Sequence, residues 1–278
     1  MTTVEAAGIT TTRPRVSSFQ VGWAMLCRDA RVLRKQFPAY VARVLVQPLL
    51  LLFTFSYVLP SANVGVGGGG STFTTVMVPG VIGSTMIFAG ITGVTVPLIA
   101  EIGYPREIDD RLLAPIPPWG IAVQKIVTGS AQSLLAALMI LPVLIFLHAP
   151  GQAPALHVSD WPFLICVFVL ASILSASLGL VLGTLLDPTK FNILFNVIMM
   201  PALMLGCVYF PWAYLGRVPW LQIVVLVNPI VYLSESFRIV LTPTIPHLAT
   251  PVCVLALVLG DVAAITAGIR CFHRRVRR

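Results

Sequence analysis

The sequence predicts an all-α polytopic membrane protein with six transmembrane helices, and its composition and apolar pattern lead to this fold class. Hydrophobic residues make up 57% of the 278 residues and charged residues only 10%, whereas soluble domains carry about 25% charged residues. Six apolar stretches are each long enough for a helix rising ~1.5 Å per residue to cross ~30 Å of hydrocarbon. The predicted spans are 40–59, 76–100, 121–147, 162–186, 191–210 and 251–270.

The basic residues orient these spans. Of the 18 Lys and Arg residues, 16 lie near the N-terminus, in the 101–125 segment, in the short 187–190 loop or in the C-terminal tail. Only Arg217 and Arg238 fall on the other side. Because basic residues are retained in the cytoplasm, we expect a plasma (inner) membrane protein with both termini cytoplasmic. The net charge of +8 then indicates contact with anionic lipids, not with nucleic acid.

The chain begins with two segments that precede the first span. Residues 1–16 are rich in threonine and are expected to be a mobile tail. In 17–39, apolar residues recur at helical spacing beside a basic face, which is typical of an amphipathic helix lying in the headgroup plane. An ordinary soluble helix is the alternative. The residues concerned are Phe19, Trp23, Leu26 and Ala30 on the apolar face, with Arg28, Arg31, Arg34 and Lys35 on the basic face.

Nothing in the sequence indicates a nucleotide, cofactor or metal site in this chain. The glycine-rich loop at 61–75 is not followed by the residues of a phosphate-binding loop, and no lysine follows the glycines that a Walker motif needs. The five cysteines are widely separated and form no metal-ligand spacing. We therefore expect no catalytic residues and no ATP hydrolysis by the chain itself.

The segment 211–249 is too apolar for a solvated loop, yet it is interrupted by proline and glycine. This pattern predicts a re-entrant hairpin of two short helices that enters the outer leaflet and returns. Non-helical backbone at that depth is tolerated only where it is buried in protein or lines a cavity. Glu235 and Arg238, three residues apart, are expected to pair, either to stabilise a gate or simply as a structural salt bridge. The predicted gate residues are Pro229, Tyr232, Glu235 and Arg238.

The segment 101–120 carries six charges between two long apolar spans. Its alternating charges, followed by Leu112 and Leu113, predict a short surface helix with an exposed apolar pair. A docked partner explains such a pair, and a helix lying in the membrane interface is the alternative.

Three motifs in this order resemble those of type-2 ABC export permeases, the membrane subunits of drug, lipid and cell-surface polysaccharide exporters. They include the permeases of daunorubicin resistance and of O-antigen or nodulation-factor export. The resemblance covers nearly the whole chain. The motifs are Val78-Pro79-Gly80-Val81 at the second span; Glu101, Gly103, Glu107, Arg111, Leu112, Leu113, Pro115 and Trp119 after it; and Pro229-Ile230-Val231-Tyr232 followed by Arg238.

The resemblance implies a mechanism and partners. Two permeases, as two copies or as paralogues, would bind two copies of a separate ATPase that uses ATP and Mg²⁺. The 101–120 segment would be the coupling helix, with Leu112 and Leu113 as anchors and Glu107 and Arg111 fixing its register. The family's architecture places the pathway mainly between the second and fifth spans, with the hairpin at its outer end.

The substrate class follows only from the fifth span. Phe195, Met199 and Met204 are candidates for lining the pathway, and an apolar, adaptable surface suits a hydrophobic drug or a lipid. A polysaccharide or glycolipid is the alternative within the family. A secondary transporter or a membrane-embedded enzyme is the alternative of another class, although no internal repeat supports the first.

Asp261 lies near the middle of the last predicted span. A charged carboxylate there costs several kcal/mol unless it is paired, neutralised or facing water. We expect a structural role for Asp261, with a role in transport as the alternative.

We predict the topology from the asymmetry of basic residues. In a background without the five native cysteines, single cysteines at Gly68 and Gln152 should react with a membrane-impermeant thiol reagent in intact cells. A cysteine at Asp109 should not react, because the cytoplasmic segment is shielded. Labelling at position 109 from outside would overturn the orientation.

Overall fold

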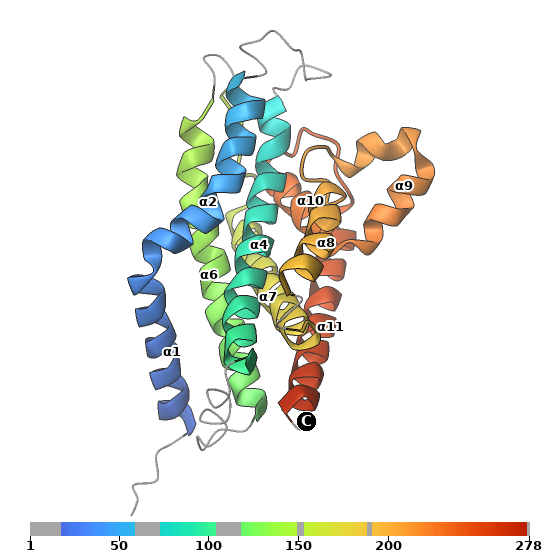
Figure 1. The fold of residues 1–278 in the computed structure, drawn as a ribbon. Coiled ribbons are helices and arrows are strands. Elements are labelled where there is room, and N and C mark those ends of the chain that lie inside the picture. The colour runs from blue at the N-terminus through green and yellow to red at the C-terminus, as the bar shows by residue number, and fades with distance from the viewer. Residues whose placement is uncertain (1–17, 59–72, 104–117, 149–152, 188–190, 277–278) are drawn as a thin grey trace, which may run out of the picture.

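The computed structural model describes residues 18–58, 73–103, 118–148, 153–187 and 191–276, and the regular structure within these ranges is helical. The long elements run lengthwise beside one another, as Figure 1 shows. In chain order the elements are α1 (Ser18–Lys35), α2 (Phe37–Phe53), the π-helical turn η1 (Thr54–Val58), α4 (Phe73–Gly103), α6 (Pro118–Phe146), α7 (Trp161–Leu185), α8 (Phe191–Met204), the 3-10 helix η2 (Trp212–Arg217), α9 (Pro219–Val224), the 3-10 helix η3 (Val225–Val227), α10 (Pro229–Leu241) and α11 (Thr250–Val276).

Among the described residues, five helices are long and apolar enough to cross a membrane. They confirm the predicted first, second, third, fourth and sixth spans as long apolar helices. The predicted fifth span, 191–210, is shorter than expected, because α8 ends at Met204 after 14 residues. A further candidate is the pair Pro219–Val227 and Pro229–Leu241, whose halves are bent by 99°. Such a bend fits either a broken span or a re-entrant loop.

The two ends of the described chain lie at the same end of the bundle. In Figure 1, the beginning of α1, the end of α4, the beginning of α6 and the end of α11 all lie at the bottom. This arrangement agrees with the prediction that the termini share one side of the membrane. Which side that is stays a prediction from the basic residues.

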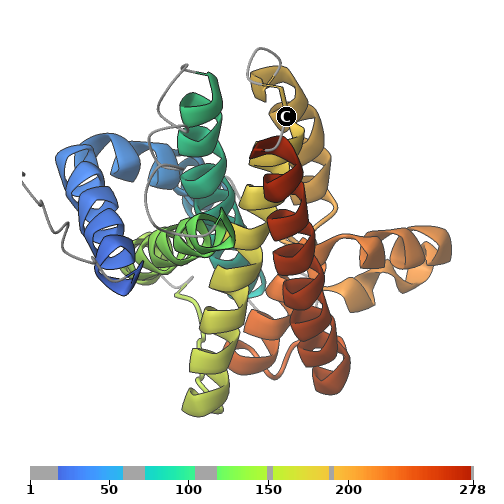
Figure 2. The ribbon, with the colours of Figure 1, turned by 90° about the horizontal axis from the view of Figure 1, so that it is seen from below.

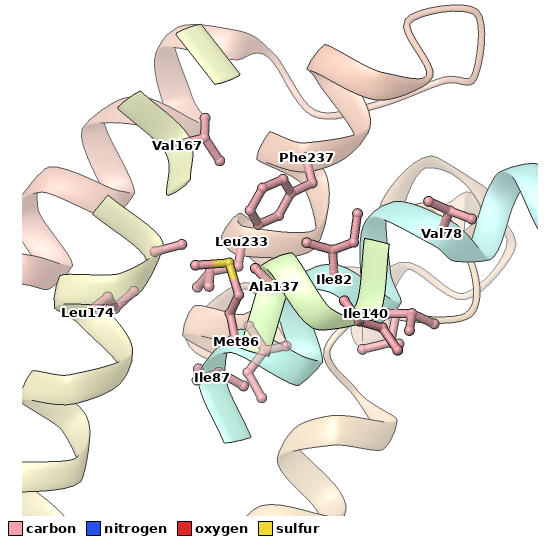
Figure 3. Packing of buried hydrophobic residues seen from close by; sticks show 14 of the residues in the cluster. Val78, Ile82, Met86, Ile87, Ala137, Ile140, Val167, Leu174, Leu233 and Phe237 are labelled. Carbon is pink, nitrogen blue, oxygen red and sulfur yellow. The ribbon is translucent and has the colours of Figure 1, made fainter. Parts of the chain in front are cut away.

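Helix α4 is the centre of the fold. It packs against α2, α6, α7 and α10, and its apolar residues form the middle of the largest buried cluster. Figure 3 shows Ile82 and Met86 of α4 meeting Ala137 of α6, Leu174 of α7 and Phe237 of α10. Because α4 is covered on several sides, it carries apolar residues all around and is the most buried of the spans.

Small residues allow the central helices to approach closely. A Cβ on Gly179 of α7 would lie 2.8 Å from the carbonyl oxygen of Ile91 on α4, closer than any side chain could fit. At the same crossing the Thr95 hydroxyl donates to the Gly179 carbonyl oxygen at 2.8 Å. On α6, the Ser133 hydroxyl donates to the Met86 carbonyl oxygen at 2.9 Å. Close backbone approach and interhelical hydrogen bonds are what hold helices together inside a membrane.

Candidate gate and coupling region

The segment between α8 and α11 forms a bent helical arm at one side of the bundle. η2, α9 and η3 project away from the other helices (Figure 2), and the chain then turns sharply into α10, which packs against α4. All of α10 from Ile230 to Leu241 is buried except Tyr232, which is partly exposed. The segment therefore consists of two helical halves that meet at a sharp bend, and its identity as a re-entrant hairpin stays a prediction.

Asn228 fixes the sharp turn into α10. Its side-chain oxygen accepts a hydrogen bond from the Ile230 backbone N–H at 3.0 Å, which caps the helix. Its side-chain amide donates to the Ala202 carbonyl oxygen on α8 at 2.6 Å. Pro229 follows as the first helical residue, where proline needs no hydrogen-bond partner. Across the turn the Tyr232 hydroxyl donates to the Leu226 carbonyl oxygen at 2.8 Å, which ties the two halves of the arm together.

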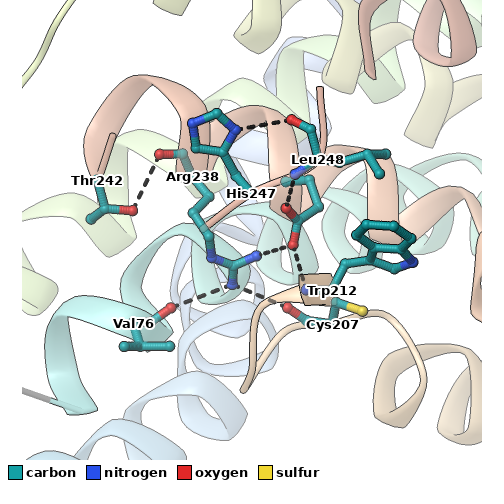
Figure 4. A network of polar contacts seen from close by, with 8 residues as sticks. Val76, Cys207, Trp212, Arg238, Thr242, His247 and Leu248 are labelled. Atoms are coloured by element: carbon teal, nitrogen blue, oxygen red, sulfur yellow. Dashed lines mark hydrogen bonds and ion pairs between the residues drawn. The ribbon is translucent and has the colours of Figure 1, made fainter. Parts of the chain in front are cut away.

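Glu235 is fully buried and joins three parts of the chain (Figure 4). One carboxylate oxygen accepts from the Trp212 backbone N–H at 2.9 Å and from the Arg238 guanidinium. The other accepts from the Leu248 backbone N–H at 2.9 Å. The carboxylate thus holds the beginning of η2 and the segment before α11 against α10.

Arg238 is also fully buried and extends the same network toward α4. Besides Glu235, its guanidinium donates to the carbonyl oxygens of Cys207 at 3.2 Å and Val76 at 3.4 Å. Cys207 lies in the turn after α8 and adopts a left-handed backbone conformation, with φ of 51°. The pairing of Glu235 with Arg238 that the sequence predicts is present. Both side chains are fully buried, so the ion pair can hold neighbouring segments together but is closed to solvent.

Gly80 explains why the same region can pack so tightly. A Cβ at this position would lie 2.0 Å from the backbone carbonyl oxygen of Val208. Only glycine lets the turn after α8 lie directly on the surface of α4. The Val78-Pro79-Gly80-Val81 motif therefore has a packing role at the point where the arm leaves α8.

The coupling segment is described only at its two ends. Gly103 is the last residue of α4, and Glu107, Arg111, Leu112, Leu113 and Pro115 lie outside the described residues. Glu101 is buried, and its carboxylate pairs with the Lys125 ammonium at 2.6 Å. This ion pair joins the end of α4 to the first turns of α6, on either side of the coupling segment. Contact of Glu101 with an ATPase stays a prediction.

The residues proposed to line the pathway point in different directions on α8. Phe195 and Met199 are buried, and the Phe195 ring centre lies 6.1 Å from that of Phe88 on α4. Met204 is 48% exposed, so only this one of the three lies on the open face of the single chain. Other exposed apolar residues of α8 are Ile193, Val197 and Met200.

Asp261 is buried on α11, which packs against α7 and α10. Neither of its carboxylate oxygens has a hydrogen-bond partner within the part of the chain that the structure describes. The expected structural role is compatible with this position, because no basic group pairs with it there.

Sequence reasoning missed two contacts that position the site. Lys125 is the only lysine within a predicted span, and that isolation in an apolar stretch was the available signal for its pairing with Glu101. The Asn228 side chain had a weaker signal, the Asn-Pro pair that opens α10. Its hydrogen bond to Ala202 could not be inferred, because every residue has a backbone carbonyl oxygen and the residue type does not show which one accepts.

Comparison with known proteins gives one family. A family model described as ABC-2 type transporter matches residues 20–242, from the beginning of α1 through the end of α10. No curated protein matches the chain.

Removing one member of the buried pair should destabilise the fold strongly. We expect Glu235→Gln and Arg238→Met each to cost about 3–5 kcal/mol, because each leaves a buried charge or a set of buried acceptors without a partner. The double variant should lose clearly less than the sum of the two, since it removes both charges. Thermal unfolding in detergent measures these losses, with the exposed Arg217→Met as the matched control. Additive losses would contradict the network.

Asp261→Asn should leave assembly, thermal stability and transport near those of the parent protein. If the carboxyl group is neutral and only packed, the amide keeps its shape and its hydrogen-bonding capacity, so the substitution removes nothing that the fold needs. The measurements are the unfolding midpoint and transport by reconstituted protein. Loss of transport in a correctly assembled Asp261→Asn protein would give this residue a role in the mechanism.

Proposed function

The chain belongs to the ABC-2 type transporter family, and we propose that it is the permease subunit of an ATP-driven exporter. The substrate would be a hydrophobic or amphiphilic molecule, a drug or a lipid, moved out of the cytoplasm or the inner leaflet. Energy would come from a separate ATPase subunit, since the chain has no nucleotide-binding motif.

The family match carries the proposal. It extends over residues 20–242 and so includes the helices on both sides of the coupling segment as well as the bent arm. A secondary transporter or a membrane-embedded enzyme would not be expected to match this family over such a length. The long apolar helices support a multi-pass membrane protein of this kind.

The ion pair between Glu101 and Lys125 supports the coupling role of the 101–120 segment. A helix that transmits force from an ATPase needs firm attachment at both of its ends. The pair links those ends directly, with an N–O distance of 2.6 Å. Movement of the coupling segment would then displace α4 and α6 together.

A second copy of the permease, or a paralogue, would cover the apolar faces on either side of α4. A groove between α2, α4 and α8 has Val44, Leu51, Phe88 and Leu203 among its lining residues. Next to it α2 and α8 present exposed apolar side chains, which in a single chain would face lipid. These residues are Val46, Leu50 and Phe53 on α2 and Val197, Met200 and Met204 on α8.

The same faces support the proposed substrate class. Flexible methionine side chains adapt to apolar molecules of different shape, and Met200 and Met204 are both exposed. One feature favours the alternative, a polysaccharide or glycolipid. The rings of Phe53 and Tyr57 stack at 5.5 Å and are partly exposed, and flat rings suit the C–H faces of sugars.

The decisive experiment is an ATPase assay on purified complexes. The permease is reconstituted with candidate ABC ATPase subunits from the same organism, and hydrolysis is measured with drugs, lipids and glycolipids as candidate substrates. We expect stimulation only when both subunits are present, and stronger stimulation by apolar amphiphiles. The absence of a complex with any ATPase would refute the proposal.

Substitutions in the coupling segment should weaken binding of the permease to its ATPase without preventing insertion of the permease into the membrane. We expect Glu107→Lys and Leu113→Asp to leave the permease inserted, to weaken co-purification with the ATPase and to abolish transport. Losing an interface anchor or creating a like-charge contact costs up to several kcal/mol of binding. Arg217→Glu, which reverses an exposed charge on the opposite predicted side of the membrane, is the control. An intact, active complex in both variants would show that the coupling helix lies elsewhere.

A further inference from the structure

A cavity of about 440 Å³ lies between α1 and the bundle. Its volume falls in the range of small-molecule sites, about 300–1,000 Å³. Four elements contribute to its walls: α1, the beginning of α2, the last turns of α4 and the first turns of α6. In Figure 1, α1, the end of α4 and the beginning of α6 lie in the lower half of the molecule, and α2 begins at about its middle. The cavity is separate from the buried network around Arg238.

Hydrogen bonds attach two of the helices that line the cavity, α1 and α2, to a third, α6. Asp29 of α1 accepts from the side-chain amide of Gln124 at 2.5 Å and from the Thr128 hydroxyl at 3.4 Å, which anchors α1 to α6. The Tyr40 hydroxyl donates to the Gln132 carbonyl oxygen at 2.5 Å, which anchors α2 to α6. The space between these anchors is part of the fold, because α1 and α2 are both attached to α6 around it.

The cavity is lined by more positive than negative charge. Arg28, Arg43 and Lys125 contribute three cations, and Asp29 and Glu101 contribute two carboxylates, which leaves a net charge of +1. Both carboxylates are already engaged by partners in the walls. Among the described residues, no carboxylate lies within ion-pair distance of Arg43. The cavity therefore suits an anion.

One side of the same cavity is apolar. Val32 and Leu33 of α1 face it together with Val96 and Pro97 of α4. A small inorganic anion would gain nothing from these side chains. A molecule with a charged head and an apolar body would contact both kinds of wall.

The length of α6 predicts how the cavity lies relative to the hydrocarbon. The span that includes Lys125 runs over 28 residues, Trp119–Phe146, or ~42 Å of helix, whereas the hydrocarbon core is ~30 Å thick. If Phe146 marks one edge of the hydrocarbon, the other edge falls near Lys125, on the side that carries most of the basic residues. Arg28, beside Asp29, then lies near this edge, because Asp29 bonds to Gln124 and Thr128. Arg43 lies deeper, one turn beyond Tyr40, and its long side chain can reach back toward the phosphates.

We propose that this cavity binds the phosphate headgroup of an anionic phospholipid from the cytoplasmic leaflet. The guanidinium group of Arg43 can form paired hydrogen bonds with phosphate oxygens, and Arg28 adds positive charge to the same cavity, while the apolar wall contacts the beginning of the acyl chains. Because Arg28 belongs to α1 and Arg43 to α2, a bound lipid bridges the two helices. It would hold α1 in place beside the coupling region.

The test measures lipid binding to the full-length permease in neutral detergent, without an ATPase. The probes are dioctanoyl-phosphatidylglycerol, dioctanoyl-phosphatidylcholine and inorganic phosphate, followed by native mass spectrometry and thermal unfolding. We expect one phosphatidylglycerol per chain to bind saturably and raise the unfolding midpoint, with much weaker binding of the other two. Equal binding of phosphatidylcholine would overturn the proposal, and equal binding of inorganic phosphate would reduce the site to one for a free anion.

Two variants locate the site. Arg43→Gln should weaken phosphatidylglycerol binding about tenfold, because one charge-assisted contact is lost, and Arg28→Gln should act in the same direction. Arg31→Gln is the matched control, since Arg31 is an exposed cation on α1 that does not line the cavity. Equal losses in all three variants would show general attraction to the surface and would overturn the proposal. The permease function can fail in the ATPase assay without affecting this result, because binding needs neither a partner nor transport.

Discussion

The buried charge of Arg238 is the constraint on which the arrangement of the segments around α10 depends. A guanidinium with no exposed surface must be neutralised and hydrogen-bonded where it lies. Glu235 supplies the charge, and the carbonyl oxygens of Val76 and Cys207 supply further acceptors. These partners come from α10, α4 and the turn after α8. Hydrogen bonds from one guanidinium, neutralised within its own helix, thus connect three separate segments.

The two ends of α4 are fastened by different kinds of interaction. Near its beginning, Gly80 lets the backbone at Val208 lie directly on the helix, and Val76 accepts from Arg238. At its end, Glu101 pairs with Lys125. The middle is held by apolar packing and by small residues. This distribution places the two charged groups that contact α4, Arg238 and Lys125, near the predicted gate and the coupling segment, while apolar packing and hydroxyl hydrogen bonds hold the helix between them.

Most of the long helices could be predicted from sequence because a span is defined by length and apolarity, which the residues state directly. The fifth span was predicted too long, since the stretch 191–210 stays apolar beyond Met204 while the backbone leaves the helix there. The sequence also did not reveal which side of α8 faces the core. Apart from Asn192 and Asn196 the helix is apolar, so periodicity could not separate Phe195, which faces α4, from Met204, which is exposed. The pairing of Glu235 with Arg238 was readable from spacing, but its backbone partners were not.

The length of α4 has a mechanical consequence. From Val76 to Glu101 the helix is unbroken, and 25 residue steps at ~1.5 Å each give a rod of ~38 Å. A rod attached at both ends conveys a push or a tilt from one attachment to the other, and Pro79 and Pro97, which each remove one backbone hydrogen bond, are the places where it bends most easily. A shift at the Glu101 end therefore reaches the turn after α8 as a shift of the surface on which Val208 rests. The stiffness of one helix, not a chain of side-chain rearrangements, would be enough to relate the two ends of this protein.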